Sequence, residues 1–269
     1  MNLDFICIGA KHAGLNELEN LLRRHNSIYM PSQTNTGFFE SNHCLEPKSL
    51  ELYKKKFKDR KAGKLTGTLE ADVHLNNANI NRITQVFGAQ VKFLFVIRNP
   101  IDRAFHHYLN SYRNGAEKLD FMEAIKSEKH WLKNTDTNNG LLLNAYGNSS
   151  EDLNGYIYRG DYFKTLDFLY KNYSKELVKI VDFENLKNLN KPIIDSICEF
   201  LGLPFQEGLL PPKVKPKLFS RLRAYRSYLN KPVALDENVR SYLYYTYFKS
   251  NIDKTEKLLN RSLSHWRVV

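Results

Sequence analysis

The chain has few of the residues that build disulfide frameworks, and it has no long apolar run. It contains three cysteines in 269 residues, Cys7, Cys44 and Cys198, and no C-x-x-C pair of the kind that binds zinc. We therefore expect no metal, and the odd cysteine count favours a reducing compartment. The first apolar run, residues 5–8, is too short for a signal peptide or a membrane span. These absences predict a cytoplasmic protein without a membrane span.

The chain also lacks an unbroken run of five or six basic residues, although it is basic overall. Lysine and arginine number 40 against 29 acidic residues, which gives a formal charge of +11. Such a surplus attracts polyanions, whether nucleic acid, an anionic membrane or a multiply phosphorylated or sulfated small molecule. A solvated basic surface explains the charge equally well. Because no recognition motif accompanies the charge, we expect no nucleic-acid partner.

The apolar residues that are present indicate one α/β domain over residues 1–269. They make up 42% of the chain, enough for a sizeable core. Apolar runs predict strands at 4–8, 28–31, 91–97 and 177–181. Helical spacing predicts helices after Gly14, from Pro100, and over 77–87, 160–173, 193–201 and 236–259, the last with a break at 250–251. This alternation predicts a central parallel β-sheet flanked by helices. We expect 210–217 to be a surface loop.

The first motif is a P-loop-like turn, Gly9-Ala10-Lys11-His12-Ala13-Gly14, between a strand and a helix. Backbone N–H groups at such a helix start form an anion site. A nucleoside triphosphatase would continue with Lys and Ser or Thr, whereas this chain has Leu15 and Asn16. Magnesium-dependent ATP chemistry, including a nucleotide kinase, is therefore disfavoured. A tight turn without a ligand is the alternative.

The second motif is residues 92–108, in which a strand ends at Arg98-Asn99-Pro100 and Arg103 follows. The strand brings Arg98 to its carboxyl end, where open α/β sheets bind ligands. The planar guanidinium group suits a phosphate. The alternative is that Arg98 and Arg103 form surface ion pairs.

Residues 92–108 closely resemble the 3′-phosphate-binding segment of sulfotransferases that use 3′-phosphoadenosine 5′-phosphosulfate (PAPS). Other segments resemble the same family in the same order: residues 5–22 its 5′-phosphosulfate loop, 28–31 and 38–39 its substrate-side loop, 159–162 its central helix entry, 199–204 its FLGLP run, and 263–266 its C-terminal ending. The resemblance is nearest to the carbohydrate, heparan-sulfate-type branch. It implies the P-loop-like sulfotransferase fold.

The resemblance also implies a function. The chain is expected to move a sulfonate group from PAPS to a hydroxyl or amine of a carbohydrate-like acceptor without a metal. The two motifs are then expected to grip opposite ends of one nucleotide. The implied nucleotide-binding residues are Lys11, His12, Ala13, Gly14, Leu15, Asn16, Arg98, His106 and Lys217. Lys217 belongs to a basic segment, 213–221, where the family closes a loop over the nucleotide; a solvated charge cluster is the alternative.

The sequence departs from the family in its nucleotide-binding segments. His12 stands where the loop lysine is usual, Leu15 and Asn16 replace two hydroxyl residues, and His106 replaces a serine. The loop cation is therefore either Lys11 or a protonated His12.

The substrate-side loop departs as well. Thr34 and Asn35 replace the usual Lys-Glu, so the catalytic base must come from elsewhere. Candidates for it are Glu40, Glu70, Asp72 and His74, each more commonly a surface or capping residue. These changes leave one alternative open, a catalytically inactive sulfotransferase-like protein that binds nucleotide or glycan.

Overall fold

The computed structural model describes residues 2–134, 155–210 and 234–268. Its centre is a parallel sheet of five strands in the order β2-β3-β1-β4-β5. The strands are β1 (Phe5–Gly9), β2 (Ile28–Tyr29), β3 (Leu65–Leu69), β4 (Lys92–Ile97) and β5 (Val178–Asp182). The predicted single α/β domain with a central parallel sheet is confirmed.

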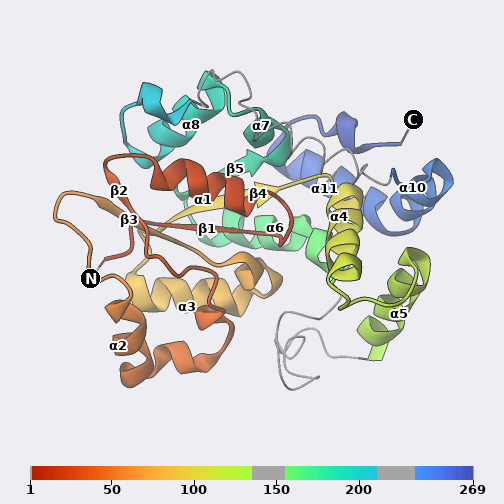
Figure 1. Cartoon of the computed structure of the whole chain (residues 1–269), viewed down its shortest axis with the longest axis horizontal. Coiled ribbons are helices and arrows are strands. Elements are labelled where there is room, and N and C mark those ends of the chain that lie inside the picture. Colours follow the sequence, from red (N-terminus) through yellow and green to blue (C-terminus); the bar gives the residue numbers. More distant parts are fainter. Residues whose placement is uncertain (1, 135–154, 211–233, 269) are drawn as a thin grey trace, which may run out of the picture.

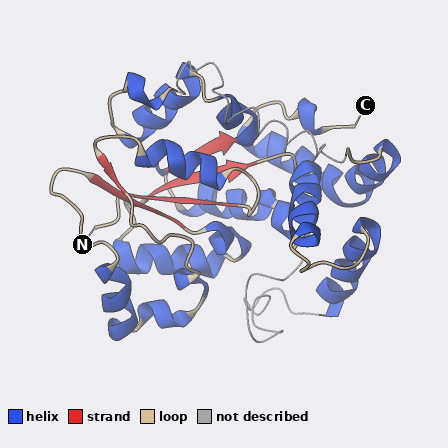
Figure 2. Ribbon diagram, viewed as in Figure 1, coloured by secondary structure: helices blue, strands red, loops and turns tan. Residues whose placement is uncertain are grey.

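Helices cover both faces of this sheet, as Figure 2 shows. They are α1 (Leu15–Arg23), α2 (Pro47–Lys55), α3 (Asn77–Phe87), α4 (Pro100–Arg113), α5 (Phe121–Asn134), α6 (Tyr162–Asn172), α7 (Phe183–Asn188), α8 (Lys191–Leu201), α10 (Glu237–Leu243) and α11 (Lys249–Leu259). In Figure 1, α1, α7 and α8 lie above the sheet, and α3 and α6 lie below it. No helix in the described part of the chain has both the length and the apolarity to cross a bilayer.

The central strands are continuous apolar runs because helices bury them on both sides. All of β1 and Phe93–Ile97 of β4 are buried, and the two strands pair from Phe5↔Lys92 to Gly9↔Val96. On the other side of β1, Gly67 of β3 lies under the Phe5 ring. A Cβ atom at Gly67 would lie 2.0 Å from that ring, so no larger residue fits there.

Local sequence signals mark where several helices begin and end. The side chains of Asn76, Asn99 and Asn190 accept hydrogen bonds from the first turns of α3, α4 and α8. Gly202 closes α8 with a φ of +74°, in the left-handed region that glycine adopts without strain. These caps set the boundaries of the helices that connect the strands.

The strand order creates a crevice at the carboxyl edge of the sheet. From β1 the chain passes through α1 to β2, beyond β3, whereas from β3 it passes through α3 to β4 on the other side of β1. The loops after β1 and β3 therefore leave in opposite directions. A reversal of this kind is where open α/β sheets bind ligands.

Some predictions of local structure need correction. Strand β3 and the helices α2, α5 and α7 were not predicted. The C-terminal helix is interrupted by a π-helical turn at Tyr244–Phe248, before the predicted break at 250–251. In that turn Tyr244 and Phe248 are buried. The predicted loop after Leu210 lies outside the described residues.

Candidate functional site

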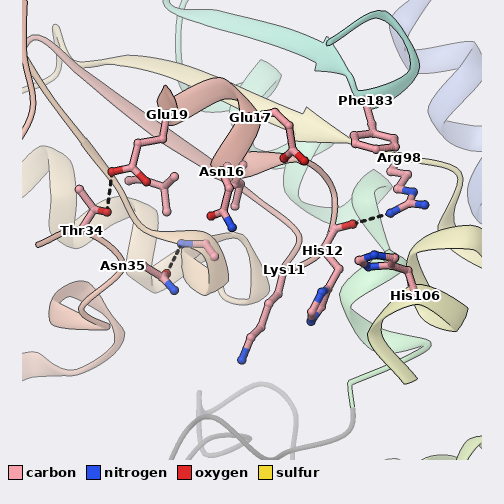
Figure 3. A pocket seen from close by; sticks show the side chains of 14 residues that line it. Lys11, His12, Asn16, Glu17, Glu19, Thr34, Asn35, Arg98, His106 and Phe183 are labelled. Atoms are coloured by element: carbon pink, nitrogen blue, oxygen red, sulfur yellow. Dashed lines mark hydrogen bonds between the residues drawn. The ribbon is translucent and has the colours of Figure 1, made fainter. Parts of the chain in front are cut away.

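A pocket of about 370 Å³ opens at the carboxyl edge of the sheet. Segments that follow all five strands contribute to it. Its lining includes Lys11, His12 and Asn16 after β1, Thr34 and Asn35 after β2, Ala71 after β3, Arg98 and His106 after β4, and Phe183 after β5 (Figure 3). The two sequence motifs therefore meet in one pocket, as expected.

The turn between β1 and α1 depends on two glycines. Gly9 has a φ of +130°, and a Cβ atom there would lie 2.3 Å from the carbonyl oxygen of Val96. Gly14 has a φ of +102°, and a Cβ atom there would lie 2.4 Å from the ring of Phe183. Gly14, the N-cap residue of α1, has no side chain to accept hydrogen bonds from the first-turn N–H groups. The first-turn N–H groups of α1 therefore form an anion site at the pocket wall.

Two arginines hold successive carbonyl groups of this turn, an arrangement that we call the carbonyl clamp. Nη1 of Arg98 donates to the His12 oxygen at 3.0 Å, and Nη1 of Arg103 donates to the Lys11 oxygen at 3.1 Å. Nη2 of Arg103 also donates to the oxygen of Gly155 at 3.1 Å and to that of Tyr156. Arg103 is fully buried, so the alternative of a surface ion pair is wrong for this residue.

Arg98 keeps part of its guanidinium group available for a ligand. Its guanidinium stacks over the Phe183 ring at 4.4 Å from the ring centre, which fixes the guanidinium plane. Nη1 is the one Arg98 donor with a hydrogen bond to a described residue. Arg98 lines the pocket beside His12 and His106 (Figure 3).

Three histidines pack together beside the clamp. The His12 ring stacks on His107 with centroids 4.5 Å apart and meets the edge of His106 at 5.5 Å. Burial, helped by the charge of Arg103, lowers the pKa of His12 to about 3. Burial and Arg98 also lower the pKa of His106. Both shifts favour the neutral imidazole, so neither ring supplies a positive charge to the ligand-free site.

Two carboxylates also line the pocket, and the sequence analysis did not single them out. Glu19 accepts a hydrogen bond from Arg23 at 2.6 Å and one from Thr34 at 2.8 Å. Glu17 lies in the first turn of α1, and its charge raises the pKa values of Arg98 and His106 against the effect of burial. The charges of Glu17 and Glu19 thus offset those of Lys11 and Arg98 in the lining.

Asn35, which stands where the resemblance expects a catalytic Glu, has a structural role. Its backbone N–H donates to the Leu69 oxygen at 2.6 Å, and its side-chain oxygen accepts from the Ala71 N–H at 2.8 Å. Its φ of +54° lies in the left-handed region, which asparagine tolerates better than most residues. Asn35 therefore ties the end of β3 to the loop after β2.

Glu70, a candidate base, holds the same loop through hydrogen bonds. It is fully buried and accepts hydrogen bonds from the N–H groups of Thr36 at 2.8 Å and Gly37 at 2.9 Å. The hydroxyl groups of Thr36 and Tyr53 contact its other oxygen. Burial raises the pKa of Glu70 to about 7. Since both oxygens of Glu70 are hydrogen-bonded to the loop or to Tyr53 of α2, Glu70 has a structural role, and it is not available as a base.

Glu40, the next candidate, is half-buried in a 3₁₀ turn, Phe38–Glu40. Burial, followed by the charges of Asp72 and Glu70, raises its pKa to about 7. The positive charges of Arg159 and Lys11 act in the opposite direction. No donor among the described residues is hydrogen-bonded to the Glu40 carboxylate. Glu40 does not line the pocket, but its carboxyl group has a pKa of about 7 and lies within the electrostatic reach of Lys11, which does.

The other two candidates, Asp72 and His74, are structural. Nε and Nη2 of Arg159 donate to the two oxygens of Asp72 at 3.0 and 2.9 Å. Burial alone would raise the pKa of Asp72, but the charge and hydrogen bonds of Arg159 outweigh it and hold the pKa at about 2. The His74 ring is buried between the carbonyl oxygens of Ala71 and Arg159.

The structure brings together most of the nucleotide-binding residues predicted from the sequence. Lys11, His12, Gly14, Leu15, Asn16, Arg98 and His106 all line the pocket. Ala13 is fully buried and does not line it, and Lys217 lies outside the described residues. Within residues 2–134, 155–210 and 234–268, no three His, Cys, Asp or Glu side chains gather as metal ligands would.

Comparison with known proteins agrees with this geometry. Residues 3–250 match the profile of the sulfotransferase domain. A solved sulfotransferase from Alicyclobacillus acidocaldarius is 20% identical, with all of both chains covered and a TM-score of 0.71. The sulfotransferase domain of the curacin biosynthetic pathway is 14% identical, with 98% of this chain and 99% of that chain covered and a TM-score of 0.56. The sulfotransferase domain of the Synechococcus PCC 7002 olefin synthase is 13% identical, with coverage of 96% and 94% and a TM-score of 0.50. No curated protein matches this chain by sequence.

Proposed function

Because this chain belongs to the sulfotransferase domain family, we propose that it transfers a sulfonate group from PAPS to a hydroxyl or amine of a carbohydrate-like acceptor. The observation that carries the proposal is that two features meet in one pocket at the carboxyl edge of the sheet. The uncapped start of α1 and Arg98 both line it, and they are joined by a 3.0 Å hydrogen bond from Arg98 to His12.

The pocket residues fit a doubly phosphorylated adenosine. The first-turn N–H groups of α1 and the Lys11 ammonium supply donors for a 5′ anion. Arg98, fixed by Phe183, and the neutral ring of His106 supply donors for a 3′-phosphate. The volume of about 370 Å³ falls within the range of small-molecule sites. Lys217, which the resemblance adds to the nucleotide-binding residues, lies outside the described residues.

The chemistry requires positive charge at the 5′ end of the site. PAPS supplies a sulfonate on a phosphate oxygen, and negative charge grows on that oxygen as the sulfonate leaves, as it does in phosphoryl transfer. Lys11 is positioned to stabilise this charge, because it lines the pocket beside the uncapped turn of α1. His12, whose pKa lies at about 3, instead packs the loop against His107.

Glu40 is our proposed base for the acceptor. A base acts best when its pKa lies near the working pH, and the pKa of Glu40 is raised to about 7. Figure 3 shows Lys11 and His12 leaving the loop on the same side, and the Lys11 charge acts on Glu40. The acceptor hydroxyl or amine would then lie between Lys11 and Glu40. The carbohydrate-like acceptor and the cytoplasmic location stay predictions.

The test is transfer of labelled sulfur from PAPS to a panel of glycans. Lys11→Ala is expected to abolish transfer, whereas His12→Ala is expected to retain part of it, and Lys171→Ala, an exposed lysine on α6, serves as the control. The opposite result, with transfer lost in His12→Ala alone, would overturn the assignment of the loop cation. Nucleotide binding without transfer to any glycan would favour the inactive binding protein instead.

A further inference from the structure

The segment from Leu45 to Lys64 concentrates the positive charge of the protein. It holds eight basic and three acidic residues, a net charge of +5 out of the +11 of the whole chain. It comprises α2 and the turn that leads into β3. Five of its basic residues are exposed: Lys48, Lys55, Lys58, Arg60 and Lys61. So high a local density of one sign raises the local concentration of anionic partners.

The same segment exposes two leucines. Leu52 of α2 is 57% exposed, and Leu45, two residues before the helix, is 45% exposed. The opposite face of α2 is anchored in the core, because Tyr53 is only 3% exposed and stacks on Phe38 with ring centroids 4.0 Å apart. Leu52 therefore points away from the core on a helix that is held firmly in place.

Helical spacing places two lysines beside Leu52. Lys48 and Lys55 lie four residues before and three after Leu52, which are neighbouring positions on a helix surface, whereas the Lys56 ammonium lies over the Tyr53 ring at 5.3 Å. Glu51 is the one acidic residue of α2, and it is paired with Lys55 at 3.6 Å. We call this surface, Leu45 and Leu52 with the exposed basic residues of 48–61, the α2 surface.

The α2 surface is separate from the proposed nucleotide site. Residues 56–64 lead into the amino end of β3, whereas the pocket lies at the carboxyl end of that strand, where Leu69 and Ala71 line it. In Figure 1, α2 lies at the lower left of the molecule, below the sheet and near α3. A partner bound at the α2 surface would therefore leave the pocket open.

We infer that the α2 surface docks the protein on membranes rich in anionic phospholipids. Lysines around an exposed apolar side chain match such a membrane, in which the lysines meet the lipid phosphates and the leucine enters the acyl boundary. A nucleic acid or a sulfated glycan would form ionic contacts with the lysines but would leave Leu52 without an apolar contact. This inference does not depend on the proposed sulfonate transfer.

The test is flotation of the full chain with phosphatidylcholine vesicles, with and without phosphatidylserine, at physiological salt. Binding is expected only with phosphatidylserine. Changing Lys55, Lys58 and Lys61 to Gln is expected to weaken it roughly 100-fold, because each lysine near an anionic surface contributes about fivefold. Leu52→Ser is expected to weaken it at least about tenfold through the lost apolar contact.

Matched variants separate the α2 surface from charge or apolarity in general. Changing Lys126, Lys171 and Lys187 to Gln removes the same charge elsewhere, and Leu119→Ser removes a leucine that is 41% exposed next to α5. Both controls are expected to bind as the parent chain does. Absence of binding to phosphatidylserine vesicles would overturn the inference. Binding that is unchanged by Leu52→Ser and is displaced by heparin or DNA would also overturn the inference. In that case the surface would recognise polyanions other than lipid.

Discussion

Replacing Arg103 by Gln is expected to weaken the 5′ end of the nucleotide site selectively. Arg103 does not line the pocket, yet its Nη1 holds the Lys11 carbonyl group at 3.1 Å. That hydrogen bond orients the peptide group between Lys11 and His12. It therefore also orients the part of the turn that carries the Lys11 side chain. Arg98 holds the next carbonyl group independently. The shorter and neutral Gln side chain cannot reproduce the guanidinium fork.

The size of the effect follows from the bonds that are lost. A hydrogen bond from a charged donor contributes about 1.5–3 kcal/mol. If the Lys11 contact alone positions the loop, the affinity for a 5′-phosphate should fall by about 10- to 100-fold. The bonds to Gly155 and Tyr156 are lost as well, so the free energy of unfolding should fall by about 3 kcal/mol.

Two adenosine monophosphates distinguish positioning from general damage. Calorimetry of Arg103→Gln with the 5′-monophosphate should show the loss, whereas affinity for the 3′-monophosphate should stay within about twofold because Arg98 keeps its place. Arg113→Gln, an exposed change in the last turn of α4, is the control and should alter neither. Equal weakening of both ligands by Arg103→Gln, or no weakening, would refute the role of the clamp.

Three further variants test the charges around the pocket. Glu17→Gln should tighten binding of adenosine 3′,5′-bisphosphate roughly fivefold, since it removes about 1 kcal/mol of repulsion; unchanged or weaker binding by calorimetry would contradict this. Glu40→Gln should lower the transfer rate by about 10²- to 10⁴-fold. In the parent enzyme the rate should rise with pH through about 7, because the base must lose its proton; a rate that does not depend on pH between 5 and 9 would exclude Glu40. Asp72→Asn should lower the free energy of unfolding at pH 7 by about 3–5 kcal/mol, because Arg159 loses its carboxylate partner. The pKa of Asp72 falls from 3.8 to about 2 on folding. The difference in the free energy of unfolding between the parent chain and Asp72→Asn, measured by denaturant titration, should therefore shrink only as the pH falls below 3.8.

The sequence predicts the parts of the fold whose signals are local. The apolar runs of β1 and β4 and the cap at Gly202 are each readable within a few residues, and the structure has them within one residue of the expected places. Strand β3 was missed because its sequence, Leu65 to Leu69, contains two threonines and a glycine. Burial by neighbours and the close approach of Phe5 to Gly67 make it a strand, and neither is visible locally.

In the candidate site, too, features with local signals were predictable and features that depend on long-range contacts were not. The position of each motif after a predicted strand, together with the family resemblance, was enough to place Gly14 and Arg98 at one sheet edge. The carbonyl clamp was not predictable, because Arg103 and Lys11 are 92 residues apart and nothing near either one signals the contact. The low pKa of His12 likewise depends on burial beside Arg103, a neighbour only in the fold. Glu17 had a local signal, an acidic residue in the first turn of a helix, but that position stabilises any helix.

The most direct test of the central claim is calorimetry of the protein with adenosine 3′,5′-bisphosphate. If one pocket holds both ends of the nucleotide, one molecule should bind per chain, and both Arg98→Ala and Lys11→Ala should weaken that binding. No detectable heat at millimolar ligand, or binding that neither variant changes, would contradict the account.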